Sequence, residues 1–381
     1  MPTPSSVDQL REASSLPEWV TPYVAALIDN HASLVVSVAR ASGRGIGYLP
    51  KQELRYKCGE RPVFDLLELY CAEHGIEPRI TEQSGTTYRR FKLVLSSRSD
   101  IVDFLNPLRP YFVVQDRAVP LLVETLIPGL NHRAHTDEES FLAWVRILQT
   151  FREEVGRANR AKYDYEFFCD ELDVDPDQIH SQSFEWINND TPARAIAEVS
   201  KCERVTVVDT LEGLTETDDS PRWIVPYVAA LVDVHFDFVI KIGEQESRAV
   251  GYKIDHTLQY KAEGESIIRL LEQFLAELGI EPRIQEQDET TYEHYELIIG
   301  RRDDITKLLE VVRPYLLVRG EAVGMLINEI LPAMNAGAHS ERDTFVELIG
   351  DIEAFREAAG RANRGEYDQE YFRDKWELNS G

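Results

Sequence analysis

Apolar residues recur at helical spacing in two similar stretches of the chain, residues 19–31 and 223–235. Each stretch has a proline near its start, which suits the first turn of a helix, and each predicts a largely apolar helix. Consecutive alanines at 25–26 and 229–230 are small enough for a second helix to approach closely. We therefore expect the two helices to pack on each other and to bring their C-terminal polar side chains together. These side chains are Asp29, His31, Asp233 and His235.

The hydrophobic pattern after each helix changes to strand and helix signals in a fixed order. In the first copy, β-branched runs at Ser33–Arg40 and Ile46–Cys58 flank a glycine-rich turn, which predicts a hairpin. A helix from Pro62 to Glu73 ends at a glycine, as helices commonly do. The further elements expected are a hairpin at 78–83 and 86–96 and helices at 100–108, 118–127, 138–155 and 163–172. This order predicts an α+β fold, with an antiparallel sheet covered by helices on one side.

The whole pattern occurs twice, at a constant offset of 204 residues. Trp19 corresponds to Trp223, and Arg157 corresponds to Arg361. A period of this length lies outside the range of solenoid repeats, so we interpret it as a domain duplication whose halves form a pseudo-twofold pair within a monomer. The expected organisation is a flexible lead-in (1–18), a first repeat (19–172), a polar and acidic linker (173–218) and a second repeat (219–381).

Composition changes this picture mainly through charge. The formal net charge is −26, which ordinarily argues against a nucleic-acid partner, because binding phosphate requires a basic face. The acids are spread along the whole chain, a distribution that resembles proteins adapted to high salt, so local basic clusters are more informative than the total. The four cysteines lack C-x-x-C spacing, so neither a zinc module nor a disulfide framework is indicated. With no membrane-length apolar run and no signal peptide, we expect a soluble, cytoplasmic protein.

Three collinear pairs of segments resemble one known family. The segments 24–31 (Val-Ala-Ala-Leu-Ile-Asp-Asn-His) and 228–235 (Val-Ala-Ala-Leu-Val-Asp-Val-His) resemble the LAGLIDADG helix of homing endonucleases. Segments 104–114 and 308–318, each containing Arg-Pro-Tyr, are similar to a helix-turn segment of that family. The helices ending in Gly-Arg-Ala-Asn-Arg, at 156–160 and 360–364, are similar to its C-terminal helices and phosphate-contacting loop. The resemblance covers both repeats.

The resemblance implies a single-chain fold of two pseudo-symmetric αββαββα repeats. The motif helices would form the interface between the repeats, and the two antiparallel sheets would form a saddle in the major groove of double-stranded DNA. Alternate strand residues would then reach base edges, while loops and helix ends hold phosphates.

The motif departs from the family where the chemistry would occur. In active members, an acid two positions after the first Asp of each motif binds the divalent metals, usually Mg²⁺, that activate water. Here His31 and His235 occupy those positions. Mg²⁺ prefers oxygen ligands, whereas imidazole suits zinc, copper, iron or nickel, so the metal is left open. Asp29 and Asp233 remain, and in the family this first Asp is mainly structural.

Several interpretations of the histidines follow. Cleavage has been lost, or the two histidines bind a softer metal or act as acid and base. A third possibility is a conventional nuclease rescued by Asp29, Asp233 or Asp237. The simplest is that each histidine only fills space at a helix end. The family also implies a catalytic basic residue after the Pro-Tyr segment, where the second repeat has Arg319 but the first has Gln115.

The first repeat carries basic residues along both expected hairpins. Strand alternation places Arg55 and Lys57 on one face with Tyr56 opposite, which indicates a groove-reading surface, although an ordinary solvated face would look similar. The DNA-binding candidates here are Arg40, Arg44, Lys51, Arg55, Lys57, Arg79, Arg89, Arg90 and Lys92.

The matching hairpins of the second repeat are richer in acids. The acids are Glu244, Glu246, Asp255, Glu286, Asp288, Glu289, Glu293 and Glu296. The only lysines and arginines in these hairpins are Lys241, Arg248, Lys253, Lys261 and Arg283. We expect such a face to repel phosphate unless salt screens it. The first repeat would therefore grip DNA, and the second would bind weakly or bind something else.

The recurring Gly-Arg-Ala-Asn-Arg loops are further candidates for phosphate contact, although arginines near helix ends can also satisfy carbonyl groups. The residues are Arg157, Asn159, Arg160, Lys162, Arg361, Asn363 and Arg364.

Taken together, these features favour a sequence-specific DNA-binding protein of LAGLIDADG type, with lost or altered nuclease activity and a regulatory or DNA-maintenance role. One alternative is an active homing endonuclease that makes a staggered double-strand cut with Mg²⁺ or another divalent metal. The other is a protein-interaction scaffold.

Overall fold

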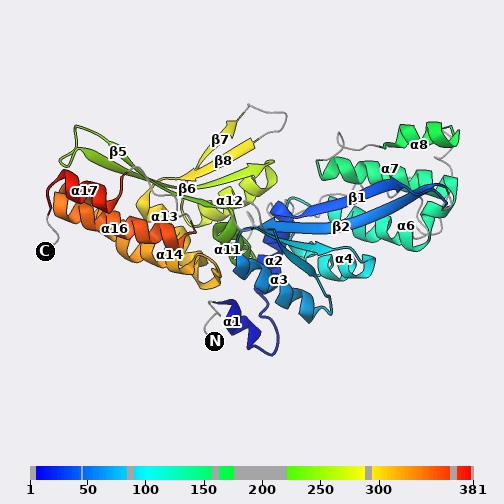
Figure 1. Ribbon diagram of the computed structural model, residues 1–381, viewed down its shortest axis with the longest axis horizontal. Coiled ribbons are helices and arrows are strands. Elements are labelled where there is room, and N and C mark those ends of the chain that lie inside the picture. The colour runs from blue at the N-terminus through cyan, green and yellow to red at the C-terminus, as the bar shows by residue number, and fades with distance from the viewer. Residues whose placement is uncertain are drawn as a thin grey trace. The chain divides into compact units, whose positions relative to one another are not determined.

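The computed structural model describes residues 6–43, 46–83, 90–156, 163–175, 221–287, 294–360 and 367–378. The chain forms two compact units. The first-repeat unit is Val20–Pro221, and the second-repeat unit combines Met1–Trp19 with Arg222–Gly381. Figure 1 shows the elements of both units.

The first-repeat unit alternates helices and hairpins and then continues in helices. Its elements are α2 (Val20–His31), β1 (Ser33–Arg40), β2 (Tyr48–Cys58), α3 (Arg61–Glu73), β3 (Arg79–Gln83), β4 (Arg90–Leu95), α4 (Arg98–Leu105), α5 (Ala118–Pro120), α6 (Ile127–Asn131), α7 (Glu138–Glu154) and α8 (Tyr165–Leu172). Short turns of 3₁₀ helix lie at Arg109–Tyr111 and Ala134–Thr136.

The second-repeat unit has the same order of elements. They are α11 (Ile224–Val234), β5 (Asp237–Glu244), β6 (Tyr252–Glu263), α12 (Ser266–Glu277), β7 (Arg283–Gln287), β8 (His294–Ile299), α13 (Arg302–Val312), α14 (Gly320–Met325), α15 (Leu331–Asn335), α16 (Arg342–Ala358) and α17 (Gln369–Lys375). The predicted α+β class with two repeats is confirmed.

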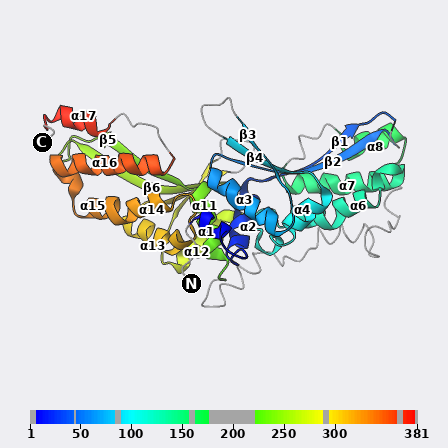
Figure 2. The same cartoon turned by 60° about the horizontal axis from the view of Figure 1, so that its bottom comes forward.

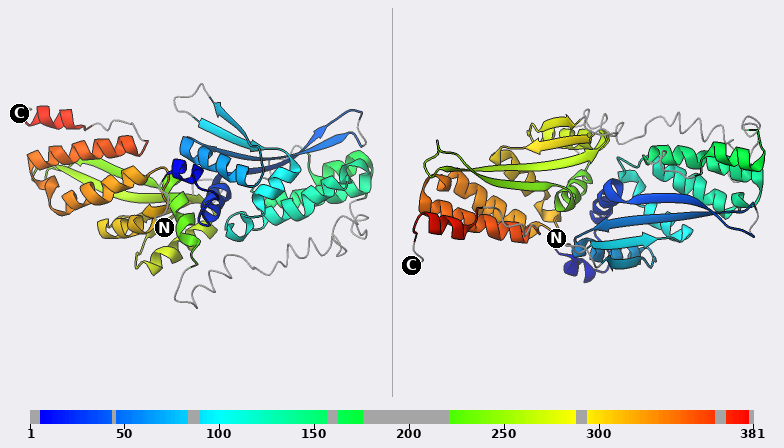
Figure 3. Two further views of the ribbon diagram at one scale, coloured as in Figure 1. Left: turned by 90° about the horizontal axis from the view of Figure 1, so that it is seen from below. Right: turned by 45° about the horizontal axis from the view of Figure 1, so that its top comes forward.

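Each unit contains one four-stranded antiparallel sheet, with strand order β1-β2-β4-β3 in one and β5-β6-β8-β7 in the other. The hairpins β1–β2 and β5–β6 are longer than the strand pairs β3–β4 and β7–β8 beside them (Figure 3). Helices gather on one side of each sheet (Figure 2). We call that side the covered face and the opposite side the open face.

Strand alternation decides which side chains enter the core. In β1, Leu34, Val36 and Val38 are buried on the covered face, and the intervening residues point to the open face. In β2, Leu54 and Tyr56 are buried. The predicted separation of Arg55 and Lys57 from the ring of Tyr56 is therefore confirmed.

Glycine ends α3 and α12 in the same way. Gly75 has φ +70° and donates its N–H to the Ala72 carbonyl at 3.1 Å, while Ile76 donates to Cys71 at 2.9 Å. Gly279 repeats this motif with φ +66°. A left-handed residue at this position satisfies carbonyl groups that a helix end leaves without partners, and glycine adopts it without a steric penalty.

Two features differ from the sequence-based expectations. The lead-in contains helix α1 (Val7–Arg11), capped by Ser6 and with Leu10 buried, instead of being wholly irregular. The helix expected at 118–127 contains a π-helical stretch at Leu121–Leu126, which hydrophobic spacing alone does not reveal. The linker expected at 173–218 lies almost wholly outside the described residues.

Candidate nucleic-acid interface

The open face of the first-repeat sheet is strongly basic. Its charged side chains are Lys51, Arg55, Lys57, Arg79, Arg90 and Lys92, with Glu53 as the one acid among the described residues. Glu53 forms an ion pair with its neighbour Arg55. The other five cations form no ion pair with described residues. A cluster of cations with a single carboxylate among them is the electrostatic pattern expected of a phosphate-binding surface.

The strand register brings some of these cations directly opposite one another. Lys57 of β2 is the cross-strand partner of Lys92 in β4, and Arg90 of β4 faces Gln83 of β3. Like charges directly opposite are unfavourable in a sheet. An anion bound between them would relieve the repulsion.

Neutral hydrogen-bonding side chains on the same face were missed from the sequence. They are Ser33 and Ser37 on β1 and Thr81 and Gln83 on β3, all of which alternate onto the open face. They carry no charge, so a pattern of charged residues does not indicate them. The signal that would have found them is the same strand alternation, followed along the edge strands.

Some predicted DNA-binding residues do not lie on this face. Arg40 stands at a strand position that alternates onto the covered face. Its Nη2 atom lies 3.2 Å from Oε1 of Glu171 in α8. Its inclusion among the DNA-reading residues is therefore not supported, because alternation at the end of β1 turns it away. The candidates that lie outside the described residues are Arg44, Arg89, Arg157, Asn159, Arg160, Lys162, Arg361, Asn363 and Arg364.

The open face of the second-repeat sheet is mixed in charge rather than acidic. Its described charged side chains are Lys241, Lys253, Lys261, Arg283, Asp237, Asp255 and Glu296. Lys253 lies 2.6 Å from Asp255, and Lys261 lies 3.7 Å from Glu296. These ion pairs neutralise much of the charge within the sheet.

The expectation of an acidic, phosphate-repelling second face was wrong for the described residues. Glu244 and Glu286 stand at strand positions that alternate onto the covered face, and Glu246 lies in the β5–β6 turn. Counting charges along hairpins without separating the two faces produced the error. Asp288, Glu289 and Glu293 lie outside the described residues.

The first Asp of each motif is a structural residue whose oxygens are occupied. Asp29 is 1% exposed, and its carboxylate accepts backbone N–H groups from Val113 at 2.6 Å, Val114 at 3.0 Å and Gln115 at 2.8 Å. Charge-assisted bonds of this kind are strong, so they fix the loop after the Arg-Pro-Tyr turn to the end of α2.

Asp233 makes the same arrangement in the second repeat. It accepts N–H groups from Leu317 at 2.6 Å, Val318 at 3.2 Å and Arg319 at 2.8 Å. A carboxylate that already accepts three backbone hydrogen bonds has little capacity left for a metal ion.

The side chains of Gln115 and Arg319 cap the two motif helices. Nε2 of Gln115 donates to the carbonyl groups of Ile28 at 3.1 Å and Asp29 at 2.9 Å. Nη1 of Arg319 donates to Val232 at 3.0 Å and Phe236 at 2.5 Å. Both side chains are buried and satisfy carbonyl groups that helix ends leave without partners.

Arg319 is additionally held by an aromatic ring, because its guanidinium lies 5.3 Å from the ring centroid of Phe238. The contacts of Gln115 and Arg319 anchor the ends of the motif helices.

Asp116 follows Gln115 in the first repeat. Burial raises the pKa of its carboxyl group, an effect that Arg117 partly opposes.

The histidines at the motif ends occupy different surroundings within their own units. His31 is the last residue of α2 and is exposed, whereas His235 follows α11, is half-buried, and donates its backbone N–H to Leu231 at 2.7 Å. The described residues contain no group of three or more His, Cys, Asp or Glu side chains able to hold a metal ion. The imidazole side chains at these two positions lack the oxygen ligands that Mg²⁺ prefers.

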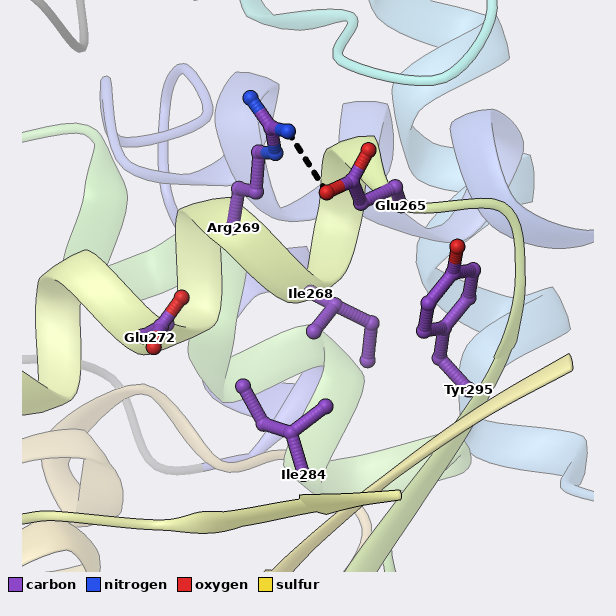
Figure 4. Close-up of a pocket in the computed structure, with 6 residues that line it drawn as sticks. All are labelled: Glu265, Ile268, Arg269, Glu272, Ile284 and Tyr295. Atoms are coloured by element: carbon purple, nitrogen blue, oxygen red, sulfur yellow. Dashed lines mark hydrogen bonds and ion pairs between the residues drawn. The ribbon is translucent and has the colours of Figure 1, made fainter. Parts of the chain in front are cut away.

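A groove on the covered side of the second-repeat sheet is separate from these surfaces. Its volume is about 440 Å³. Ile268 of α12 and Ile284 of β7 form its apolar floor, and Arg269 pairs with Glu265 at its rim (Figure 4). In the first repeat the corresponding Phe64 packs 5.5 Å from Phe91, so the smaller isoleucine opens the space.

Several solved structures with a similar fold are homing endonucleases. I-LtrWI, a LAGLIDADG homing endonuclease bound to target DNA, superposes with a TM-score of 0.63 and 12% identity, covering 88% of this chain and 97% of its own. I-SmaMI, a LAGLIDADG homing endonuclease bound to cleaved DNA, gives 0.59 and 16%, covering 89% and 97%. The protein has the LAGLIDADG homing-endonuclease fold.

A further structure of I-SmaMI, bound to uncleaved DNA in the presence of calcium ions, matches the LAGLIDADG-fold protein with a TM-score of 0.58 and 15% identity. It covers 91% of this chain and 99% of its own. No protein-family model and no curated protein sequence matches. Within the described residues, no helix is both long and apolar enough to span a membrane.

Proposed function

We propose that this LAGLIDADG-fold protein binds double-stranded DNA in a sequence-specific manner and does not cleave it, and that it acts in regulation or DNA maintenance. The observation that carries the proposal is the open face of the first-repeat sheet, where cations stand in a row while the chain as a whole carries a formal charge of −26. A basic face on an otherwise acidic protein is the electrostatic footprint of a surface that binds an anionic partner.

The chemistry of this face suits the major groove. Lysine and arginine can contact phosphates or the acceptor edge of guanine, and Gln83 can pair with adenine. Ser37 and Thr81 can donate to or accept from either kind of base pair. The open face thus combines groups for affinity with groups for sequence discrimination. I-LtrWI and I-SmaMI, which share the fold, are described as bound to DNA, and this supports the same partner here.

The motif residues favour binding over cleavage. The carboxylates of Asp29 and Asp233 are engaged by backbone N–H groups, and the guanidinium of Arg319 is engaged by helix carbonyl groups. His31 and His235 stand where active members carry acids. Imidazole is a poor ligand for Mg²⁺, so a divalent metal of the kind used by conventional members has no oxygen ligands at these positions.

The two repeats would contribute unequally to the affinity for DNA. The second open face neutralises Lys253 and Lys261 with its own carboxylates, whereas five cations of the first face are free of described ion pairs. We therefore assign most of the phosphate affinity to the first repeat. The second sheet would add discrimination through neutral groups such as Gln259 and Thr257.

Selection from random duplex pools tests binding. The protein is incubated with the pool at high KCl, and bound duplexes are amplified and sequenced over several rounds. The proposal predicts that a single sequence motif is enriched. Binding to duplexes that carry this motif should persist when nonspecific competitor DNA is added. Failure to enrich any sequence, at either high or low KCl, would favour the scaffold alternative.

Plasmid nicking tests the loss of cleavage. A supercoiled plasmid carrying the selected motif is incubated with Mg²⁺, Mn²⁺ or Zn²⁺, and the proposal predicts that it remains supercoiled with each metal. Cleavage that disappears in His31→Ala and His235→Ala would instead establish an altered nuclease.

A further inference from the structure

The last helix of each repeat docks on the turn end of the long hairpin through the same aromatic contact. In the first repeat, Tyr48 of β2 is 4% exposed and lies 4.9 Å from Phe168 of α8, centroid to centroid. In the second repeat, Tyr252 of β6 is 3% exposed and lies 4.8 Å from Phe372 of α17. Both ring pairs are edge-on, so the apolar contact alone does not distinguish one helix from the other.

The charged residues around Tyr48 join the first hairpin to α8. Oε1 of Glu171 in α8 accepts from the Tyr48 hydroxyl at 3.2 Å and from Nη2 of Arg40 in β1 at 3.2 Å. The Arg40 guanidinium also lies 5.9 Å from the Tyr48 ring centroid. Here the hairpin supplies the cation and the helix supplies the carboxylate.

Around Tyr252 the charges are exchanged. Glu244 of β5 accepts from the Tyr252 hydroxyl at 3.1 Å, and Nζ of Lys375 in α17 donates to the same hydroxyl at 2.5 Å. Lys375 also lies 4.8 Å from the Tyr252 ring centroid. Here the hairpin supplies the carboxylate and the helix supplies the cation.

The residues involved occupy corresponding positions in the two repeats. At the constant offset of 204 residues, Arg40 corresponds to Glu244 and Glu171 corresponds to Lys375, while the tyrosine between them is unchanged. A tyrosine hydroxyl both donates and accepts, so it can bridge either arrangement of charge. The exchange of sign at both ends of the network is therefore compatible with one shared geometry.

We propose that each long hairpin is a charge-selective docking surface for its own terminal helix. If α17 docked on β1–β2, Lys375 would meet Arg40 with no carboxylate between them. If α8 docked on β5–β6, Glu171 and Glu244 would compete for one hydroxyl. Like charges at such distances repel, so each wrong pairing is disfavoured while each native pairing is favoured.

This selectivity addresses a hazard of duplicated chains. Two repeats with the same aromatic docking site can exchange elements during folding or between molecules, and such swapping is a characteristic failure of repeat proteins. The inference is independent of DNA binding. The hairpin residues concerned lie beside the turns and alternate onto the covered face, so they are not among the open-face cations.

A charge-reversal cycle in the full-length protein tests the proposal, with hydrogen exchange of residues 369–375 as the readout. We expect Lys375→Glu and Glu244→Arg each to speed exchange at least about fivefold, because the helix opens more readily. The double variant E244R/K375E should return within about twofold of the wild type. Lys375→Met, which removes the charge without reversing it, should have the smaller effect. A double variant that exchanges as fast as the singles would overturn the proposal.

A graft tests selection itself. In this variant residues 369–376 carry the sequence of 165–172, so that the second hairpin is offered the α8 sequence. We expect the grafted segment to be unprotected from exchange, and Glu244→Arg to restore its protection. Protection of the graft without Glu244→Arg would contradict charge selection, as would protection that Glu244→Arg does not change.

Discussion

Arg319 and Gln115 show how one position can perform one structural task with two different side chains. Both are buried, and both donate to carbonyl groups at the end of the motif helix of their own unit. An arginine at this position suggests catalysis when only the sequence is known. The contacts show that its Nη1 atom donates to two backbone carbonyl groups.

This equivalence gives a prediction with a built-in control. We expect Arg319→Gln to lower the free energy of unfolding by about 1 kcal/mol or less, because the first repeat uses glutamine at the same place. Arg319→Ala should cost about 1–3 kcal/mol, since buried carbonyl groups lose their donors. Urea denaturation measures both. Equal losses for the two variants would argue against the capping role.

His256 allows a prediction of pH dependence. It lies in β6 on the covered face, and burial, with Arg302 nearby, lowers its pKa, an effect that Asp255 and the Gly300 backbone partly oppose. A lowered folded-state pKa means that the unfolded chain binds the proton more readily. The resulting stability is complete above pH 6.5 and is lost as the pH falls through 6.5 towards the folded-state value.

The first repeat supplies the matched substitution. Gln52 stands at the corresponding position and donates to the Ser96 carbonyl at 2.9 Å. We expect His256→Gln to raise stability at neutral pH by up to about 1 kcal/mol, by donating to the carbonyl of Gly300. The variant should also lose less stability than the wild type between pH 7 and pH 5. Thermal denaturation across this range would refute the prediction if the two curves ran parallel.

At the scale of elements, the helices and strands followed from the sequence wherever one local pattern dominated. The strand Ser33–Arg40 was predicted with the bounds observed, because the segment is an apolar run that is rich in β-branched valines. The π-helical stretch at Leu121–Leu126 was not predictable, since its hydrogen bonding depends on packing beyond the local pattern. Predicting which acids share a sheet face also required the register between the strands.

The covered-side groove gives a prediction about packing. Ile268→Phe should fill part of the space against Tyr295 and stabilise the protein by about 0.5–2 kcal/mol. The mirror variant Phe64→Ile should remove the contact with Phe91 and destabilise it. Denaturation midpoints compare the two variants. Destabilisation by both would mean that the groove cannot accept a ring.

At the scale of the whole molecule, the sequence indicated the class of fold and the basic first sheet, but it misjudged the second. Net charge and charge per hairpin are sums over both faces, whereas a groove meets only one face. The location of the open face depends on where the helices pack, and that is a tertiary property. The backbone hydrogen bonds of Asp29 agree with the structural role that the resemblance implies, whereas the capping roles of Gln115 and Arg319 depend on contacts between residues more than 80 positions apart.

The unequal charge of the two open faces gives the most direct test of the central claim. One variant replaces Lys51, Lys57, Arg90 and Lys92 with glutamine, and its matched control replaces Lys241, Lys253, Lys261 and Arg283 in the same way. The dissociation constant for a selected duplex is then measured by fluorescence anisotropy over a range of KCl concentrations. We expect the first variant to lose at least about 100-fold in affinity and to show a shallower salt dependence, because fewer counterions are released. The control should lose less than about tenfold. Unchanged affinity in the first variant, or a larger loss in the control, would contradict the assignment of DNA binding to the first-repeat sheet.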